Sequence, residues 1–219
     1  MSNSVLLHAN SPKPGAAATG WLVKAALVVW LALVFALGAA GVFPTPRSTP
    51  PFPILIALVT PVIVFIAAFR FAPAFRELVL TADLRFLTIL QAWRFAGFAF
   101  LALYTYAILP GYFALPAGLG DMAIGVTAPW VLAALNRRPK FAASKTFVAW
   151  NWFGLLDLIV AVSDGAFGPR FLAGGSAGAS QTSAMAHLPL VLVPAYFVPL
   201  YLMLHMTALF QARRERSRV

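Results

Sequence analysis

The segments 109–135, LPGYFALPAGLGDMAIGVTAPWVLAAL, and 146–162, TFVAWNWFGLLDLIVAV, decide how this chain folds. Each is a long apolar run with one carboxylate near its middle, Asp121 in the first and Asp157 in the second. At about 100° per residue, one helical face of the first segment holds Asp121 and only small residues: Ala114, Ala117, Gly118, Gly125 and Ala128. In the second segment, one side holds Trp150, Asn151, Gly154, Asp157 and Ala161. Small faces let helices approach closely, so both carboxylates are predicted to face the interior of a helix bundle.

The composition is typical of an integral membrane protein. Of the 219 residues, 61% are hydrophobic and 10% are charged, whereas roughly a quarter of a soluble domain is charged. The chain has no cysteine, which excludes disulfides, thiolate metal sites and a cysteine nucleophile. The net charge is +10, and most of the basic residues lie in short loops beside apolar runs. In these positions they indicate how the chain is oriented across the membrane. We therefore expect the lipid bilayer as a partner and no nucleic acid.

Six apolar runs predict an all-α, polytopic transmembrane helix bundle. At about 1.5 Å per residue, each run is long enough to cross a bilayer. The predicted spans are 21–41, 52–72, 86–109, 112–135, 146–162 and 188–210. They form one transmembrane domain over 21–210, between a disordered cytoplasmic tail (1–20) and a basic cytoplasmic tail (211–219).

The sequence also predicts the structure of the segments that connect the spans. A tight turn at Leu109-Pro110-Gly111-Tyr112 makes the third and fourth spans antiparallel neighbours. Residues 73–85 are either an amphipathic helix at the cytoplasmic surface or a solvated connector. Residues 163–187 are rich in Gly, Ser and Ala and are predicted to form an outer loop with no pattern of its own. Three prolines, at 189, 194 and 199, are expected to bend the sixth span.

The basic residues predict the orientation. Thirteen of the 16 Lys and Arg residues fall on one side of this layout, Arg47 and Arg170 fall on the other, and Arg94 lies within a span. This asymmetry places both termini in the cytoplasm. Residues 21–41 are interpreted as an anchor because the run is long, although Gly38-Ala39-Ala40 leaves a cleaved signal peptide as the alternative.

Six polar or ionisable side chains lie within the predicted spans: Gln91, Arg94, Asp121, Asn151, Asp157 and His205. An unpaired charge at bilayer depth costs from about 3 to more than 10 kcal/mol, so these groups are expected to pair. One hypothesis pairs Arg94 with either carboxylate. Counted from the predicted turn, Arg94 lies about six residues deeper than Asp121, roughly 9 Å along the axis, so water or Asn151 would help to bridge them.

Two further hypotheses concern the carboxylates themselves. If they approach each other, they share one proton, which is the chemistry that a proton-coupled transporter needs. In the alternative, one of them neutralises Arg94 and the other is protonated or hydrogen-bonded, so that the set only locks the bundle. Asp→Asn variants would then lower stability and leave any activity intact.

The histidines do not predict a cofactor. His205 is expected on the cytoplasmic half of the sixth span, about 27 Å from His187, so the two cannot share a metal or a haem iron. A haem held by His205 alone or between two chains remains an alternative, but a buried hydrogen-bonding role is favoured. Hydrolase motifs are missing. We therefore predict no catalytic residues, no metal site and no cofactor, and we lean against an enzyme.

A resemblance to a known family rests on four motifs. They are Gln91-x-x-Arg94-x-x-Gly97, the run from Leu109-Pro110-Gly111 to Gly120-Asp121, Trp150-Asn151-x-x-Gly154-Leu155-Leu156-Asp157, and Val198-Pro199 with Leu204-His205. This combination resembles a bacterial family of uncharacterised multi-pass membrane proteins, and the first two spans do not contribute to it. The resemblance implies a helical membrane fold in the bacterial inner membrane, and it implies no activity.

Three functions follow from these residues. The first is a small proton-coupled transporter or permease-like protein, expected to self-associate because six short spans rarely enclose a pathway alone. The second is a structural or accessory subunit whose polar residues lock helices together or bind a partner subunit. The third is a membrane enzyme that acts on a lipid or quinone, with Asp121 or His205 as acid or base.

Overall fold

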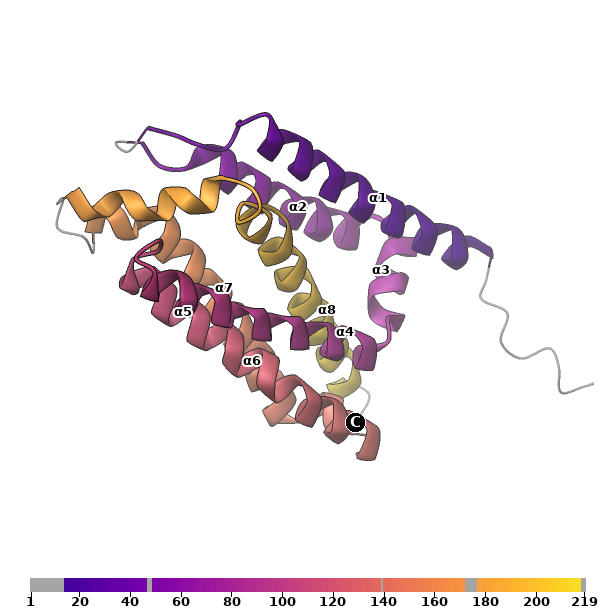
Figure 1. The fold of residues 1–219 in the computed structure, drawn as a ribbon. Helices are drawn as coiled ribbons and strands as arrows, with labels where there is room; N and C mark the ends of the chain where they lie inside the picture. Colours follow the sequence, from indigo (N-terminus) through magenta and orange to yellow (C-terminus); the bar gives the residue numbers. More distant parts are fainter. Residues whose placement is uncertain (1–13, 47–48, 139, 172–176, 218–219) are drawn as a thin grey trace, which may run out of the picture.

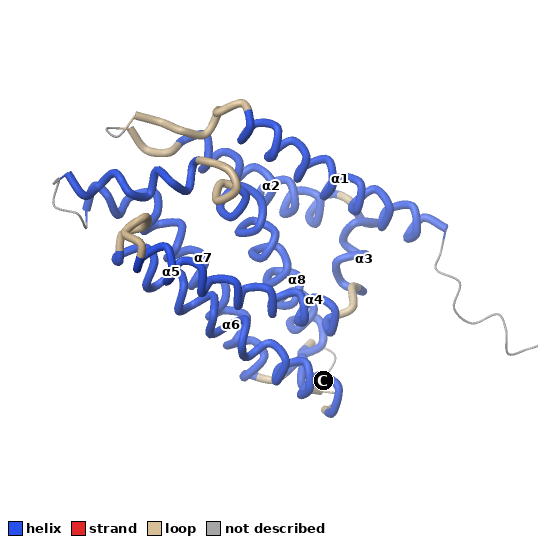
Figure 2. The backbone as a smooth tube through the Cα atoms, viewed as in Figure 1, coloured by secondary structure: helices blue, strands red, loops and turns tan. Residues whose placement is uncertain are grey.

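The computed structural model describes residues 14–46, 49–138, 140–171 and 177–217. Within these ranges the chain is helical and contains no strand (Figure 2), which confirms the all-α prediction. The α-helices are α1 (Pro14–Ala39), α2 (Phe52–Phe71), α3 (Pro73–Thr81), α4 (Leu84–Leu90), α5 (Phe98–Thr105), α6 (Gly111–Arg137), α7 (Lys145–Phe171) and α8 (Val198–Arg216). The 3-10 segments are η1 (Gln91–Gly97), η2 (Phe141–Ala143) and η3 (Ala177–Ala186), and η4 (Val193–Phe197) is a π-helix.

In the described part of the chain, six helical segments are long and apolar enough to cross a membrane. They are Ala18–Ala39, Phe52–Phe71, Leu84–Thr105, Gly111–Arg137, Lys145–Gly168 and Val193–Arg216. The third segment joins α4, η1 and α5, and the sixth joins η4 and α8. The predicted number of apolar segments is therefore confirmed.

Both ends of the helical domain extend beyond the predicted limits. Residues 14–20, expected in a disordered tail, form the first turns of α1, because proline suits the first helical position and the alanines after it favour helix. The rest of that predicted tail, 1–13, lies outside the described residues. At the other end α8 continues to Arg216, because Gln211 and Ala212 are buried. The predicted basic tail is thus helical over 211–216.

The connections also differ from the predicted ones. Helix α5 ends at Thr105, so the turn before α6 occupies 106–110 and is longer than the predicted turn at 109–112. Within this turn, Ala107 has a φ of 55°. Residues 163–171 continue α7, and η3 follows in the segment that was expected to be a patternless loop. Before α8, regular helix is interrupted by turns and by η4, where prolines lack the N–H that a helix needs.

Helix α3 settles the choice between a helix and a solvated connector in favour of a helix. It packs against α1, α2 and α8, and Val79 is buried in this contact. The Gln211 amide of α8 donates hydrogen bonds to the carbonyl oxygens of Val79 (2.8 Å) and Ala82 (2.9 Å). Arg76 donates to the carbonyl oxygens of Phe69 (3.0 Å) and Arg70 (2.7 Å), which otherwise lack partners at the end of α2.

Helix α8 lies between the α1–α2 pair and the group formed by α4 to α7 (Figure 1). Leu58, Leu158 and Val198 form a buried cluster that joins α2, α7 and α8. On the other side of α7, helix α6 packs against η1, α5 and α7. The first turns of α1 and the C-terminus lie toward the end of the bundle where α3 lies (Figure 1). This arrangement places the middles of four spans around one point.

Candidate functional site

Four charged or titratable side chains lie near the middle of their helical segments. Arg94 is the eleventh of 22 residues in its segment and Asp121 the eleventh of 27. Asp157 and His205 are each the thirteenth of 24. His205 was expected on the cytoplasmic half of the sixth span. It lies close to the middle of its segment, because the segment begins at Val193, after the proline-rich turns, and extends to Arg216.

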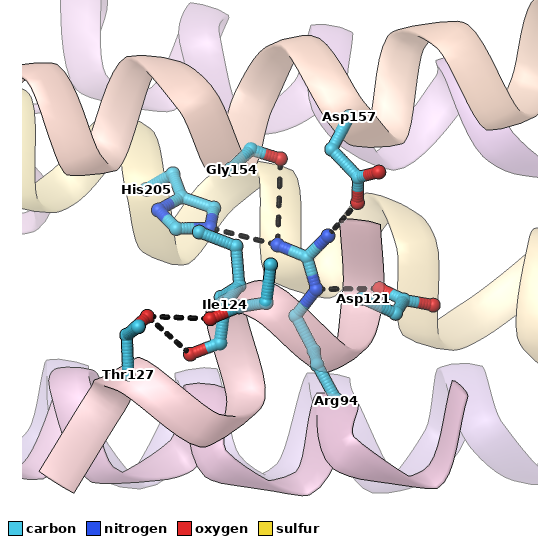
Figure 3. Close-up of polar contacts among 8 residues, drawn as sticks. Arg94, Asp121, Ile124, Thr127, Gly154, Asp157 and His205 are labelled. Atoms are coloured by element: carbon cyan, nitrogen blue, oxygen red, sulfur yellow. Dashed lines mark hydrogen bonds and ion pairs between the residues drawn. The ribbon is translucent and has the colours of Figure 1, made fainter. Parts of the chain in front are cut away.

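Arg94 contacts both carboxylates directly (Figure 3). Its Nε donates to Asp121 Oδ1 at 2.6 Å, and its Nη2 donates to Asp157 Oδ2. The third nitrogen, Nη1, lies 3.4 Å from the Gly154 carbonyl oxygen and 3.1 Å from His205 Nε2. The Arg94 side chain is fully buried. The structure thus joins three helices through one guanidinium, with no need for Asn151 as a bridge.

The expected depth difference between Arg94 and Asp121 is wrong because of the turn. Helix α5 ends at Thr105 and α6 begins at Gly111. Counted from these ends, Arg94 and Asp121 are about equally deep in their segments, not six residues apart. A direct ion pair follows from this equal depth.

His205 and Asn151 extend the network away from the carboxylates. Both are buried, with 0% and 1% of their surface exposed. The Asn151 amide nitrogen donates to the Phe147 carbonyl oxygen at 2.9 Å, so its Oδ1 is the acceptor for His205 Nδ1, also at 2.9 Å. His205 Nε2 is then the acceptor for Arg94 Nη1. This arrangement selects a neutral imidazole with its proton on Nδ1, in keeping with the favoured hydrogen-bonding role.

Gln91 does not join this network. It lies three residues before Arg94 and is 2% exposed. Among the described residues, no donor contacts its Oε1. Of the six predicted site residues, the structure therefore brings five together and leaves Gln91 beside them.

Two aromatic side chains that do not belong to the predicted set of site residues contact the site, and one of them, Trp150, lies on the face predicted to hold Asn151 and Asp157. The Tyr201 ring lies 5.9 Å from Arg94 Cζ. Because Tyr201 precedes His205 by one helical turn, the spacing in α8 could have identified it. The Trp150 ring packs edge-on against the His205 ring, with centroids 5.7 Å apart, and its Nε1 donates to Thr127 Oγ1 at 2.9 Å. The carbonyl contact of Gly154 has no signal in the sequence.

Four glycines border the site at points where a side chain has no room. A Cβ at Gly97 would overlap the Asp121 side chain, and a Cβ at Gly120 would overlap the Asp157 carboxylate. At Gly154 it would overlap the His205 ring, and at Gly125 it would overlap the backbone of η1. The small faces predicted for the helices therefore serve to bring backbones up to the charged groups.

The charges of the site do not balance. Two carboxylates share one guanidinium, and no other Lys or Arg among the described residues pairs with them. In the described part of the chain, no group of three or more His, Cys, Asp or Glu residues could hold a metal ion. With both carboxylates ionised and His205 neutral, the site carries one excess negative charge in the middle of the spans.

Comparison with known proteins yields one match. No curated protein matches the chain, and no solved structure does. A family model does match, over 51–213, and the match contains every site residue described above. It also includes α2, whereas the motifs behind the resemblance begin only at Gln91. The chain belongs to the family described as a domain of unknown function, DUF8737.

Proposed function

We propose that this chain is a multi-pass protein of the bacterial inner membrane, with both termini in the cytoplasm, and that it acts as a small proton-coupled transporter. Its proton site is the cluster of Arg94, Asp121 and Asp157. The membrane assignment is supported by six apolar helical segments, and the orientation by the excess of Lys and Arg on one side. A second copy of the chain completes the pathway in this proposal.

One observation carries the proposal: two carboxylates meet one guanidinium at the middle of the spans. A net charge buried at this depth is costly, so the site is stable when a proton or a substrate cation balances it. Exchange of one for the other on the same carboxylates is the basis of proton-coupled transport. His205 donates to Asn151 and accepts from Arg94, so it holds the guanidinium in place while the carboxylates exchange their proton.

Infrared spectroscopy of the purified protein tests the proton site. We expect the band of a protonated carboxyl group to change in intensity during a titration from about pH 4 to about pH 9. This pH range is wide enough to include a carboxyl group that titrates above its usual range. Asp121→Asn and Asp157→Asn assign the band, and Asp83→Asn, outside the site, is the control. Proteoliposomes should then show counterflow that responds to a pH gradient. A spectrum without any titrating buried carboxyl contradicts the proposal.

A second candidate, a structural or accessory subunit, is favoured by the enclosure of the site. Every guanidinium nitrogen of Arg94 has a partner, and four glycines close the space around it. In this case, Asp121→Asn and Asp157→Asn lower the unfolding temperature in detergent without any change in a titrating band. Another membrane protein should also co-purify from the native membrane. A chain that is isolated alone contradicts this second candidate.

A further inference from the structure

A groove opens on the surface between α6 and α7, next to the charged site. Its volume is about 350 Å³, and it is lined by Pro116, Leu119, Gly120, Phe153, Leu156, Asp157 and Val160. Leu119 and Leu156 are 57% and 58% exposed at its rim. In a membrane, exposed apolar side chains at mid-span face the lipid. The groove is thus open to the interior of the bilayer.

Among the residues that the structure describes, Asp157 is the one charged residue that lines this groove. Its side chain is 8% exposed, and its Oδ2 is bound to Arg94. No described residue donates a hydrogen bond to its Oδ1, which points away from the guanidinium (Figure 3). A Cβ at position 120 would overlap Oδ1, so the oxygen has room in this place only because residue 120 is glycine.

The groove therefore combines apolar walls with an acceptor that bears charge. Since the site has one carboxylate more than its guanidinium neutralises, a positively charged group is attracted to Oδ1 and an anion is repelled. An N–H donor also satisfies an oxygen that is otherwise unpaired in a poorly solvated place. An acyl chain alone would cover the walls but would leave Oδ1 without a donor.

We propose that this groove binds an amphiphilic ammonium ion that enters from the bilayer. Its ammonium group donates to Asp157 Oδ1, and its apolar body lies against Leu119, Phe153 and Leu156. The inference rests on the proposed transport function and names its substrate class: a lipophilic amine cation that takes the place of the proton. Because both compete for the same charge, the ammonium ion binds more weakly as the pH falls.

Binding of octylammonium to the full-length protein in nanodiscs tests the inference, with calorimetry as the measurement. Octanoate, which has the same chain length and the opposite charge, is the matched control ligand. We expect octylammonium to bind and octanoate not to bind. Asp157→Asn and Leu119→Trp should each weaken binding by about tenfold or more, because one removes the charged acceptor and the other fills the groove. Ile63→Trp, an equally exposed residue of α2, should bind as the wild type does.

Three results overturn the inference: octylammonium fails to bind, octanoate binds equally well, or Leu119→Trp binds like the wild type. Leu119→Trp keeps the test decisive if Asp157→Asn does not fold, because Leu119 is outside the ionic network. Failure of the inference is distinct from failure of the proposed function. If a carboxyl band titrates but octylammonium does not bind, only the inferred ligand is contradicted. If octylammonium binds but no carboxyl band titrates, only the proposed proton site is contradicted.

Discussion

Arg94 is the only basic residue that contacts the two mid-span carboxylates among the described residues. Replacing Arg94 with Met leaves both carboxylates buried without a cation, whereas either Asp→Asn variant keeps one ion pair. Breaking a buried pair by removing one partner costs about 3–5 kcal/mol. We therefore expect Arg94→Met to lower the free energy of unfolding by about that amount, and by more than Asp121→Asn or Asp157→Asn does.

Denaturation of the purified protein in mixed detergent micelles measures this order. Arg85→Met is the control, because Arg85 is exposed and lies in the same segment, and its effect should stay within about 0.5 kcal/mol. If Arg94→Met is as stable as the wild type, the guanidinium does not hold the helices together.

Some residues of the site can be predicted from the sequence, and others cannot. Charge at bilayer depth identifies Arg94, Asp121 and Asp157, because their cost demands a partner. Periodicity adds Asn151 to the same face as Asp157. Tyr201 was missed although it lies one turn from His205, and the Gly154 carbonyl could not be predicted, since every residue has one. Contacts made by the backbone depend on the tertiary structure alone.

At the scale of elements, the 3-10 segment η1 lies directly against α6. A Cβ at Gly125 would overlap the backbone of Phe95 and Arg94, which cannot rotate away as a side chain can. We therefore expect Gly125→Ala to push η1 off α6 and to lower the free energy of unfolding by about 1–3 kcal/mol, the usual cost of overpacking.

The matched control is Gly20→Ala in α1, where a Cβ meets nothing within 4 Å. There alanine only improves helix propensity and should raise the free energy of unfolding by up to about 1 kcal/mol. In the same denaturation assay, Gly20→Ala should therefore stabilise the protein, whereas Gly125→Ala should destabilise it. A Gly125→Ala variant as stable as the wild type would mean that η1 and α6 are not in close contact.

The ends of the elements were the least predictable part of the fold. The turn at 106–110 contains Tyr106, Ala107 and Ile108, which are as apolar as the helix before them, so hydropathy did not show where α5 stops. The extension of α7 beyond 162 was hidden for the opposite reason, because the glycines, the proline and the polar residues of 163–171 are typical of a loop although the segment is helical. A helix end depends on which backbone groups find partners, and composition does not report that.

For the whole molecule, the predicted orientation can be tested because the chain has no cysteine. Single cysteines at Thr49 and Tyr106 should react with a membrane-impermeant maleimide added to intact cells, since both residues are exposed at the end predicted to be outside. Cysteines at Glu77 and Lys140 should react only after the cells are opened. The opposite pattern would reverse the orientation, and a mixed pattern would contradict the six-span layout.

By itself, the sequence determined that the chain is an all-α bundle with six apolar segments, and that charges lie inside it on small-residue faces. These are properties of composition and local periodicity, which every stretch of about 20 residues carries on its own. Only the tertiary structure decided that Arg94 meets both carboxylates, that His205 lies at the same depth, and that Asp157 reaches a groove. These contacts depend on where each helix ends and how closely glycines let it approach its neighbours, and that information is shared among segments far apart in the chain.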